Sequence, residues 1–100
     1  MVDQGSAQLS RLRLANLQAQ QKAFDDALKT LAKPFNPAFA GLAFDVQGDV
    51  YAAQNKPQEA IKAYTDAWRQ LDENTEYRRL VAAKLNALGV DPAPAKGASQ

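Results

Sequence analysis

Few side chains in this chain could do chemistry, and their types argue against catalysis. None of the 100 residues is histidine or cysteine, so the usual zinc and haem ligands, a thiol nucleophile and a histidine general base are all missing. The serines lie near the two ends, at Ser6, Ser10 and Ser99. Carboxylates occur together at Asp25–Asp26 and at Glu73 with Glu76, but without an apolar pocket this pairing favours helix starts over acid–base work. We expect no enzyme, no cofactor and no metal.

The charged residues give no signal for nucleic acid or for a membrane surface. Lys and Arg number 12 against 11 Asp and Glu, a net charge of +1, whereas phosphate binding needs a clustered basic excess. No apolar run approaches the roughly 18 residues of a membrane span, and residues 1–10 lack the regions of a signal peptide. Met1 before a polar stretch suggests an excised fragment. We expect the fragment itself to be soluble, with membrane contact only through an upstream anchor.

Helices must position these side chains. Apolar residues recur every three or four positions, and no segment alternates with a period of two. The pattern predicts an all-α fold of about five helices, near residues 9–20, 24–31, 37–54, 57–71 and 76–88. Asn36 and Thr75 are predicted N-caps, Pro37 opens the third helix and Gly89 closes the fifth. The domain is expected to span 9–89, with a flexible lead-in at 1–8 and a disordered tail at 90–100.

The helices form pairs that repeat. Residues 27–31 (ALKTL) match 60–64 (AIKAY) at an offset of 33 residues, and the same offset aligns Ala15 with Gly48. A helix-turn-helix unit with a period near 34 resembles the tetratricopeptide pattern, W-x2-L-G-x2-Y…A-x3-F…P. The expected scaffold positions are Ala15, Ala27, Phe44, Gly48, Tyr51, Ala60, Tyr64 and Ala67. Gln47 and Asp72 depart from the pattern, and the first copy is degenerate. An unrelated bundle of helical hairpins is the alternative.

Two repeats need covering at both ends. The fifth helix is expected to act as a cap over the fourth, because about three units are normally needed for a stable stack. The outer side of the first helix has no such cover within the chain. Upstream residues, a second copy of the protein or a partner could supply it.

A longer order of motifs resembles a narrower family. Residues 11–15 (RLRLA), 39–51 (FAGLAFDVQGDVY) and 80–89 (LVAAKLNALG) follow one another as in the C-terminal part of the YfgM-like ancillary subunits of the SecYEG translocon. The resemblance covers about 9–89. It implies a bacterial inner-membrane protein with an N-terminal transmembrane helix and a periplasmic tetratricopeptide domain. It also implies association with the translocon and with periplasmic chaperones, in the handover of emerging secretory proteins.

The first helix of each pair is expected to line a concave partner-binding face. The residues predicted there are Leu12, Asn16, Gln20, Leu42, Asp45, Asp49 and Arg78, with Ala19, Ala52, Ala53, Ala82 and Leu85 beside them. Such a groove suits an extended or helical peptide. Only Asn16 matches the lysines and asparagines with which some of these domains hold a C-terminal carboxylate, and Asp45 and Asp49 would repel one. A basic or apolar segment fits better, and ordinary solvated surface is the alternative.

These patterns favour a non-enzymatic module for binding protein or peptide segments, through equilibrium binding to a preformed face. By the resemblance, its partners are translocon subunits, periplasmic chaperones or secretory clients, at the periplasmic face of the inner membrane. A generic repeat scaffold, or a homodimer formed through the first helix, is the alternative.

Overall fold

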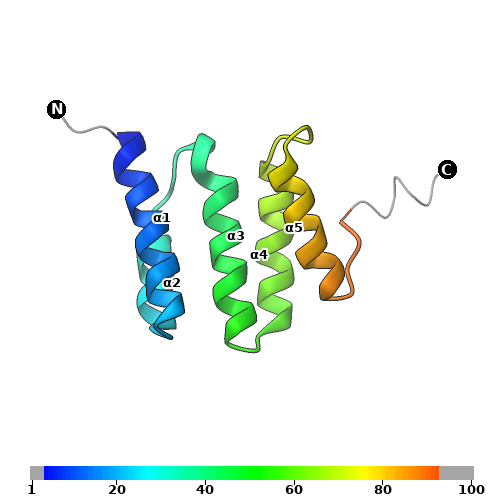
Figure 1. The fold of residues 1–100 in the computed structure, drawn as a ribbon, viewed down its shortest axis with the longest axis horizontal. Coiled ribbons are helices and arrows are strands. Elements are labelled where there is room, and N and C mark those ends of the chain that lie inside the picture. The colour runs from blue at the N-terminus through cyan, green and yellow to red at the C-terminus, as the bar shows by residue number, and fades with distance from the viewer. Residues whose placement is uncertain (1–3, 93–100) are drawn as a thin grey trace.

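Five helices make up the structure, a computed structural model that describes residues 4–92. The helices are α1 (Gln4–Gln20), α2 (Phe24–Ala32), α3 (Pro37–Ala53), α4 (Pro57–Gln70) and α5 (Glu76–Ala87), and the described residues contain no strand (Figure 1). The predicted all-α fold of five helices is therefore confirmed. Over residues 4–92, none of the helices combines the length and the apolar character needed to cross a membrane.

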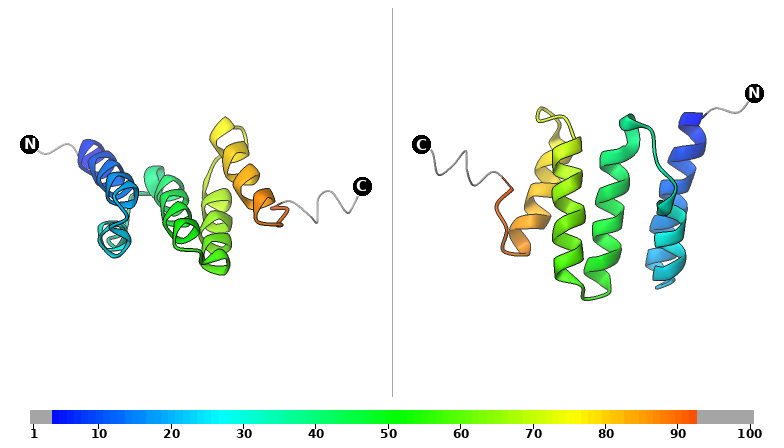
Figure 2. Two further views of the ribbon diagram at one scale, coloured as in Figure 1. Left: turned by 60° about the horizontal axis from the view of Figure 1, so that its bottom comes forward. Right: turned by 180° about the vertical axis from the view of Figure 1, so that it is seen from behind.

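Short connections fold the helices into antiparallel hairpins that stack side by side. α1 pairs with α2 and α3 with α4, while α5 packs on α4. Figure 2 shows α1, α3 and α5 in one layer and α2 and α4 in the other. In its left view α3 lies lower than α1 and α5, nearer the layer of α2 and α4, so the layer of α1, α3 and α5 presents a concave face. We call this side of the molecule the concave face.

The same turn closes the first helix of each unit. Lys22, Asn55 and Gly89 have left-handed backbone conformations, with φ of 64°, 60° and 86°. The amide that follows each donates to the carbonyl five residues back, Ala23 to Gln18, Lys56 to Tyr51 and Val90 to Leu85, at 2.8, 2.9 and 2.9 Å. This Schellman arrangement satisfies carbonyls at a helix end. Because positions 22, 55 and 89 are 33 and 34 residues apart, the turns repeat with the expected period, and α5 begins a third unit.

The helix starts match the sequence pattern at Thr75 but not at Asn36. The Thr75 hydroxyl accepts a hydrogen bond from the Arg78 amide at 3.2 Å, as expected of an N-cap. Asn36 does precede Pro37 at the start of α3, but its side chain makes no capping hydrogen bond. Its backbone amide instead donates to Gln8 Oε1 at 2.8 Å, which ties α1 to the α2–α3 connection.

Within the described residues, helix and core extend beyond both predicted bounds of the domain. α1 begins at Gln4, so residues 4–8 belong to the helix and not to a flexible lead-in. The residues here include Ala and Gln, which favour helix, and the contact from Gln8 holds the first turns in place. At the other end, Val90 packs against the core, although the predicted tail begins there. Residues 1–3 of that lead-in and 93–100 of that tail lie outside the described residues.

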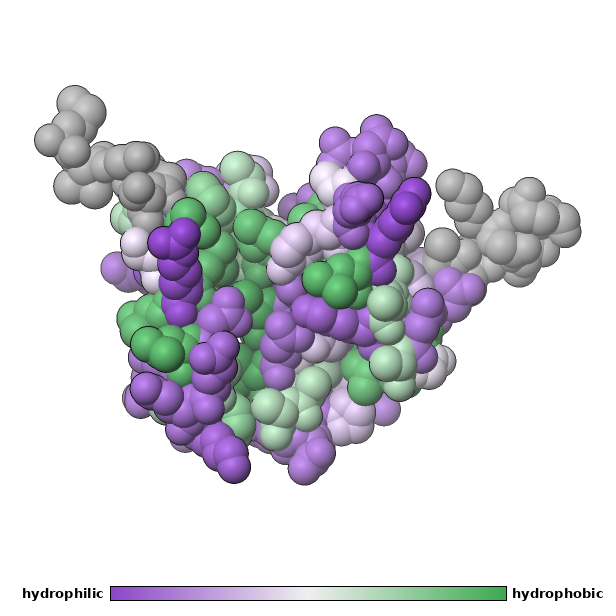
Figure 3. Space-filling model, viewed as in Figure 1, coloured by the Kyte–Doolittle hydropathy of each residue, from purple (hydrophilic) through white to green (hydrophobic). Residues whose placement is uncertain are grey.

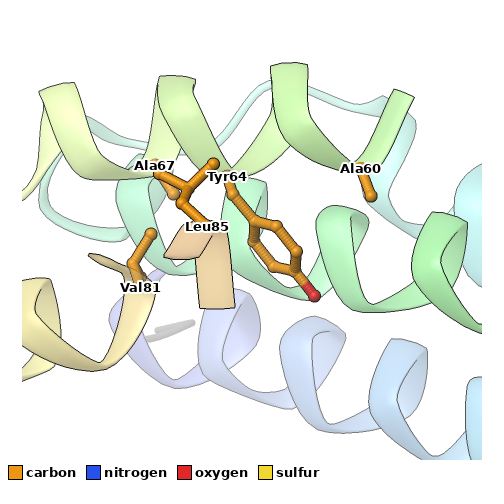
Figure 4. Close-up of a cluster of buried hydrophobic side chains, with 5 residues drawn as sticks. All are labelled: Ala60, Tyr64, Ala67, Val81 and Leu85. Atoms are coloured by element: carbon orange, nitrogen blue, oxygen red, sulfur yellow. The ribbon is translucent and has the colours of Figure 1, made fainter. Parts of the chain in front are cut away.

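Two apolar clusters hold the stack together. The N-terminal cluster joins α1 to α3 and consists of Leu12, Ala15, Ala43 and Val46. The C-terminal cluster joins α4 to α5 and consists of Ala60, Tyr64, Ala67, Val81 and Leu85 (Figure 4). Phe44 and Tyr51 of α3 are half-buried against this second cluster, and Ala27 of α2 is fully buried. α5 therefore covers the apolar side of α4.

Gly48 allows α3 and α4 to approach closely. A Cβ atom at this position would lie 2.5 Å from two carbons of the Tyr64 ring. Such a distance is far inside van der Waals contact, so only glycine fits beside the ring. The glycine of the repeat pattern thus has a packing reason in this structure.

Candidate functional site

The concave face is the surface on which the sequence predicts partner binding. Figure 3 views it from the front and shows apolar side chains along the hollow between α1 and α3 and at the free edge of α1. More polar side chains appear toward α5. The face therefore has two halves of different chemistry, one between α1 and α3 and one between α3 and α5.

In the α1–α3 half, the structure buries one predicted residue and exposes two. Leu12 is 4% exposed and packs in the N-terminal cluster, because the apolar side of α1 turns toward α3. It is core and not a surface residue. Asn16 and Gln20 are exposed on α1, and Leu42 is half-buried against the same cluster. Of the alanines predicted beside them, Ala19 is half-buried and Ala52 and Ala53 are exposed.

Asp45 is buried between α3 and α5, although the sequence predicts it as an exposed groove residue. It is 2% exposed. The Tyr77 hydroxyl donates to Asp45 Oδ2 at 2.5 Å, and Lys84 Nζ donates to Asp45 Oδ1 at 3.0 Å. Both donors come from α5 and close over the carboxylate. Asp45 therefore holds α5 against α3 and is not accessible to a partner.

Asp49, one turn further along α3, remains accessible. Its side chain is 40% exposed. The Tyr64 hydroxyl of α4 donates to it at 2.5 Å, and Lys84 Nζ lies 3.1 Å from Asp49 Oδ1. One ammonium group is thus shared by two carboxylates. We call Asp45, Asp49, Tyr64, Tyr77 and Lys84 the carboxylate network.

Burial and hydrogen bonding set the protonation of this network. Burial raises the pKa of Asp45 above its usual value, and the bonds from Tyr77 and Lys84 offset only part of that effect. Burial opposes the charged form of Lys84, but the bond to Asp45 and the carboxylate charges outweigh it and raise its pKa. Burial and a bond to a carboxylate raise the pKa of Tyr64 and of Tyr77. At neutral pH the tyrosines therefore stay donors and Lys84 stays charged.

Sequence reasoning missed the half of the network that comes from α4 and α5. It placed Asp45 and Asp49 on one face of a helix but assigned them no cation, since Lys84 is 39 and 35 residues away. A signal was present, because Lys84 interrupts the mostly apolar stretch 80–85. A charge within an apolar helix face needs a partner when that face is buried.

On α5, Arg78 serves the junction with α4. Its Nε donates to the Trp68 carbonyl at 2.8 Å, and its guanidinium lies 3.5 Å from the centre of the Trp68 ring. The bond satisfies one of the last carbonyls of α4, and the stacking is a cation–π contact. Arg78 is half-buried by these contacts, Ala82 is half-buried, and Leu85 is fully buried in the C-terminal cluster. The α5 residues that the sequence predicts on the concave face are therefore buried or half-buried.

The described residues hold no group of three or more His, Cys, Asp or Glu side chains placed to bind a metal ion. The carboxylates of the network are paired with a lysine and two tyrosines, and this arrangement locks helices together. Of the residues predicted on the concave face, Asn16 and Gln20 are thus exposed, and Leu42 and Asp49 are partly exposed.

Comparison with known proteins gives two matches. A family model described as a tetratricopeptide repeat-like domain matches residues 1–90. The ancillary SecYEG translocon subunit of Neisseria gonorrhoeae is 41% identical over 80 residues, which cover 80% of this chain and 38% of that protein. The chain therefore spans less than two fifths of the length of this relative. No solved structure gives a significant match.

Proposed function

The chain belongs to the tetratricopeptide repeat-like domain family, and from that premise we propose that it is a non-enzymatic module that binds protein partners through its concave face. The observation that carries the proposal further is the 41% identity to an ancillary SecYEG translocon subunit. We infer that the partners are translocon subunits, the chaperones that work beside them, or secretory clients. The place of action is then the periplasmic face of the bacterial inner membrane.

A preformed surface supports this role. Two apolar clusters and the carboxylate network fix α1, α3 and α5 relative to one another. A partner that binds such a rigid face avoids the free-energy cost of ordering it. Asn16 and Gln20 offer exposed amides on α1, and Leu42 adds a partly exposed apolar side chain on α3. These features suit equilibrium capture of a polypeptide segment.

Site-specific photocrosslinking in intact bacterial membranes tests the proposal. Photoreactive residues replace Asn16 and Gln20 on the concave face, and Lys29, exposed on α2 in the other layer, is the matched control. We expect translocon subunits or secretory proteins to be recovered from positions 16 and 20 and not from 29. Equal recovery from all three positions, or recovery from none, would contradict binding through the concave face.

A second candidate function is self-association through α1. Leu9, Leu14 and Leu17 are 38%, 46% and 49% exposed. Position 17 corresponds to position 50 one unit later, where Val50 is fully buried. The free edge of α1 is thus a surface that a neighbouring unit covers elsewhere in the stack, and a second copy could cover it here.

Sedimentation at increasing protein concentration tests this second function. A homodimer predicts a rise in mass that the exposed-site change Leu14→Glu abolishes. Leu80→Glu is the control, because Leu80 is 50% exposed but lies on α5. A constant monomer mass at millimolar concentration would rule the homodimer out.

A further inference from the structure

An apolar hollow lies between the C-terminal ends of α3 and α5. The residues that line it are Ala52, Tyr64, Lys84, Ala87 and Leu88, and its volume is about 200 Å³. It continues over Asn55 and Pro57 into a second part of about 310 Å³. Because α3 and α5 form its walls while Tyr64 comes from α4 in the layer behind, it opens on the concave face. We call it the α3–α5 hollow.

The two parts of the hollow suit side chains and not a whole small molecule. Sites for drug-sized ligands close around most of the ligand, whereas both parts of this hollow are open to the surface. The smaller part has room for one large apolar side chain against Tyr64 and Ala87, and the larger part has room for at least one more against Pro57 and Leu88. A polypeptide that lies along the face could place successive apolar side chains in the two parts.

The carboxylate of Asp49 places negative charge at the edge of this hollow. Asp49 precedes Ala52 by one turn on α3, and Tyr64 and Lys84, which line the hollow, both contact the Asp49 carboxylate. Two carboxylates share the single ammonium of Lys84, so the network carries more negative than positive groups. A carboxylate offers about four acceptor positions, and Asp49 is 40% exposed. It can accept a further donor from outside.

We propose that the α3–α5 hollow binds a polypeptide segment in which a basic residue is followed by apolar residues. The cation rests against Asp49, and the apolar side chains fill the hollow beside Ala52 and Leu88. This inference rests on the proposed function, since it names the class of segment that the concave face takes. The complementarity is of charge and of apolar surface together, so an acidic or a wholly polar segment is rejected.

Fluorescence anisotropy with three labelled heptapeptides tests the inference on the full chain. The first peptide is Gly-Ser-Lys-Leu-Leu-Ser-Gly, the second replaces its lysine by glutamate, and the third replaces both leucines by serine. We expect the lysine peptide to bind at least tenfold more tightly than either of the others at low salt. The preference over the glutamate peptide should shrink at 0.5 M salt, as screening predicts.

Three variants locate the binding. Asp49→Asn should lower the affinity for the lysine peptide about fivefold, which is the contribution of one exposed ion pair. It should also reduce the preference for the lysine peptide over the glutamate peptide. Asp25→Asn removes an exposed carboxylate of α2 in the other layer and should change nothing. Ala87→Phe fills the hollow from an exposed position and should abolish binding of the lysine peptide. Helical circular dichroism confirms that each variant is folded.

The outcomes separate this inference from the proposed function. Equal affinity for the lysine and glutamate peptides, or an Asp49→Asn variant that binds as tightly as the parent, would overturn the inference. So would the absence of peptide binding at millimolar concentration. If the crosslinks from positions 16 and 20 persist in that case, the interaction module stands without this hollow. If the peptides bind as expected but those crosslinks are absent, the proposed function fails instead.

Discussion

The substitution Gly48→Ala should destabilise the protein through a single contact. The added methyl group would lie 2.5 Å from the Tyr64 ring, which cannot bend out of the way. The ring is also held at its far end, where its hydroxyl donates to Asp49 at 2.5 Å. Relief therefore requires either that α3 and α4 separate or that the ring moves and its hydrogen bond is lost.

Three effects set the size of the change. Replacing glycine by alanine inside a helix contributes about 1 kcal/mol of stability. Overpacking a tight contact costs about 1–3 kcal/mol. Loss of the bond to Asp49 adds about 1.5 kcal/mol, the low end for a charged acceptor, since that carboxylate is partly in water. The net loss is about 1.5–3.5 kcal/mol, which for a chain of this size lowers the Tm by about 6–28 °C.

Gly41→Ala is the matched control in the same helix. There the new methyl group would meet Leu71 Cδ2 at 2.8 Å and Cγ at 2.9 Å, so a change of the Leu71 χ1 angle is needed, but no ring and no hydrogen bond resist it. Rotation of that side chain costs about 0.5–1.5 kcal/mol, which the gain in helix propensity of about 1 kcal/mol offsets. Urea and thermal unfolding followed by circular dichroism should find Gly41→Ala near the parent and Gly48→Ala well below it.

A Gly48→Ala protein as stable as the Gly41→Ala protein would refute this reasoning. The Tyr64→Leu background provides a further check, because it removes the ring. In that background Gly48→Ala should cost at least about 1 kcal/mol less, the coupling expected of residues in direct contact. Additive losses in the double variant would show that the ring is not the cause.

Three other expectations concern the carboxylate network and the caps. Lys84→Met leaves buried Asp45 without its cation and should lower the free energy of unfolding in urea by about 3–5 kcal/mol. A decrease below about 1 kcal/mol would show that the pair is not buried in solution. Because the pKa of Tyr77 is raised in the folded state, its contribution to stability is complete below pH ~10 and is lost as pH rises through the folded-state pKa. Tyr77→Phe should therefore lessen the loss of stability at alkaline pH. An unchanged dependence of stability on pH would contradict this. Thr75→Ala should lower the free energy of unfolding by about 1 kcal/mol and Asn36→Ala by much less, because only the threonine side chain makes a capping hydrogen bond. Equal decreases for the two variants in thermal unfolding would contradict this.

Much of the fold could be predicted because it depends on local patterns. The spacing of apolar residues sets five helices, and prolines and a glycine mark where several of them begin or end. The period near 34 residues reappears in the positions of the three left-handed turns. Lys22 carries no sequence signal for such a turn, yet it adopts the same conformation as Asn55 and Gly89. The turn at position 22 follows from the hairpin geometry, which overrides the preference of the residue.

The candidate site was less predictable, because exposure depends on what packs against a helix. Helical spacing placed Leu12 and Asp45 on one face, and the structure buries both. Leu12 is covered because the first two units pack closely there. Asp45 is covered because Tyr77 and Lys84 reach it from the next unit. The spacing of residues along α3 alone does not show that α5 covers Asp45.

The sequence by itself determined the helices, their pairing, the repeat and the absence of histidine and cysteine chemistry. All of these depend on residue type and on interactions within a few turns of chain. Only the tertiary structure decided that Asp45 is buried and fixes α5 while Asp49 stays partly exposed. These two carboxylates lie on one face, one turn apart on α3, and they differ because the side chains of α5 close over the first and only reach the edge of the second.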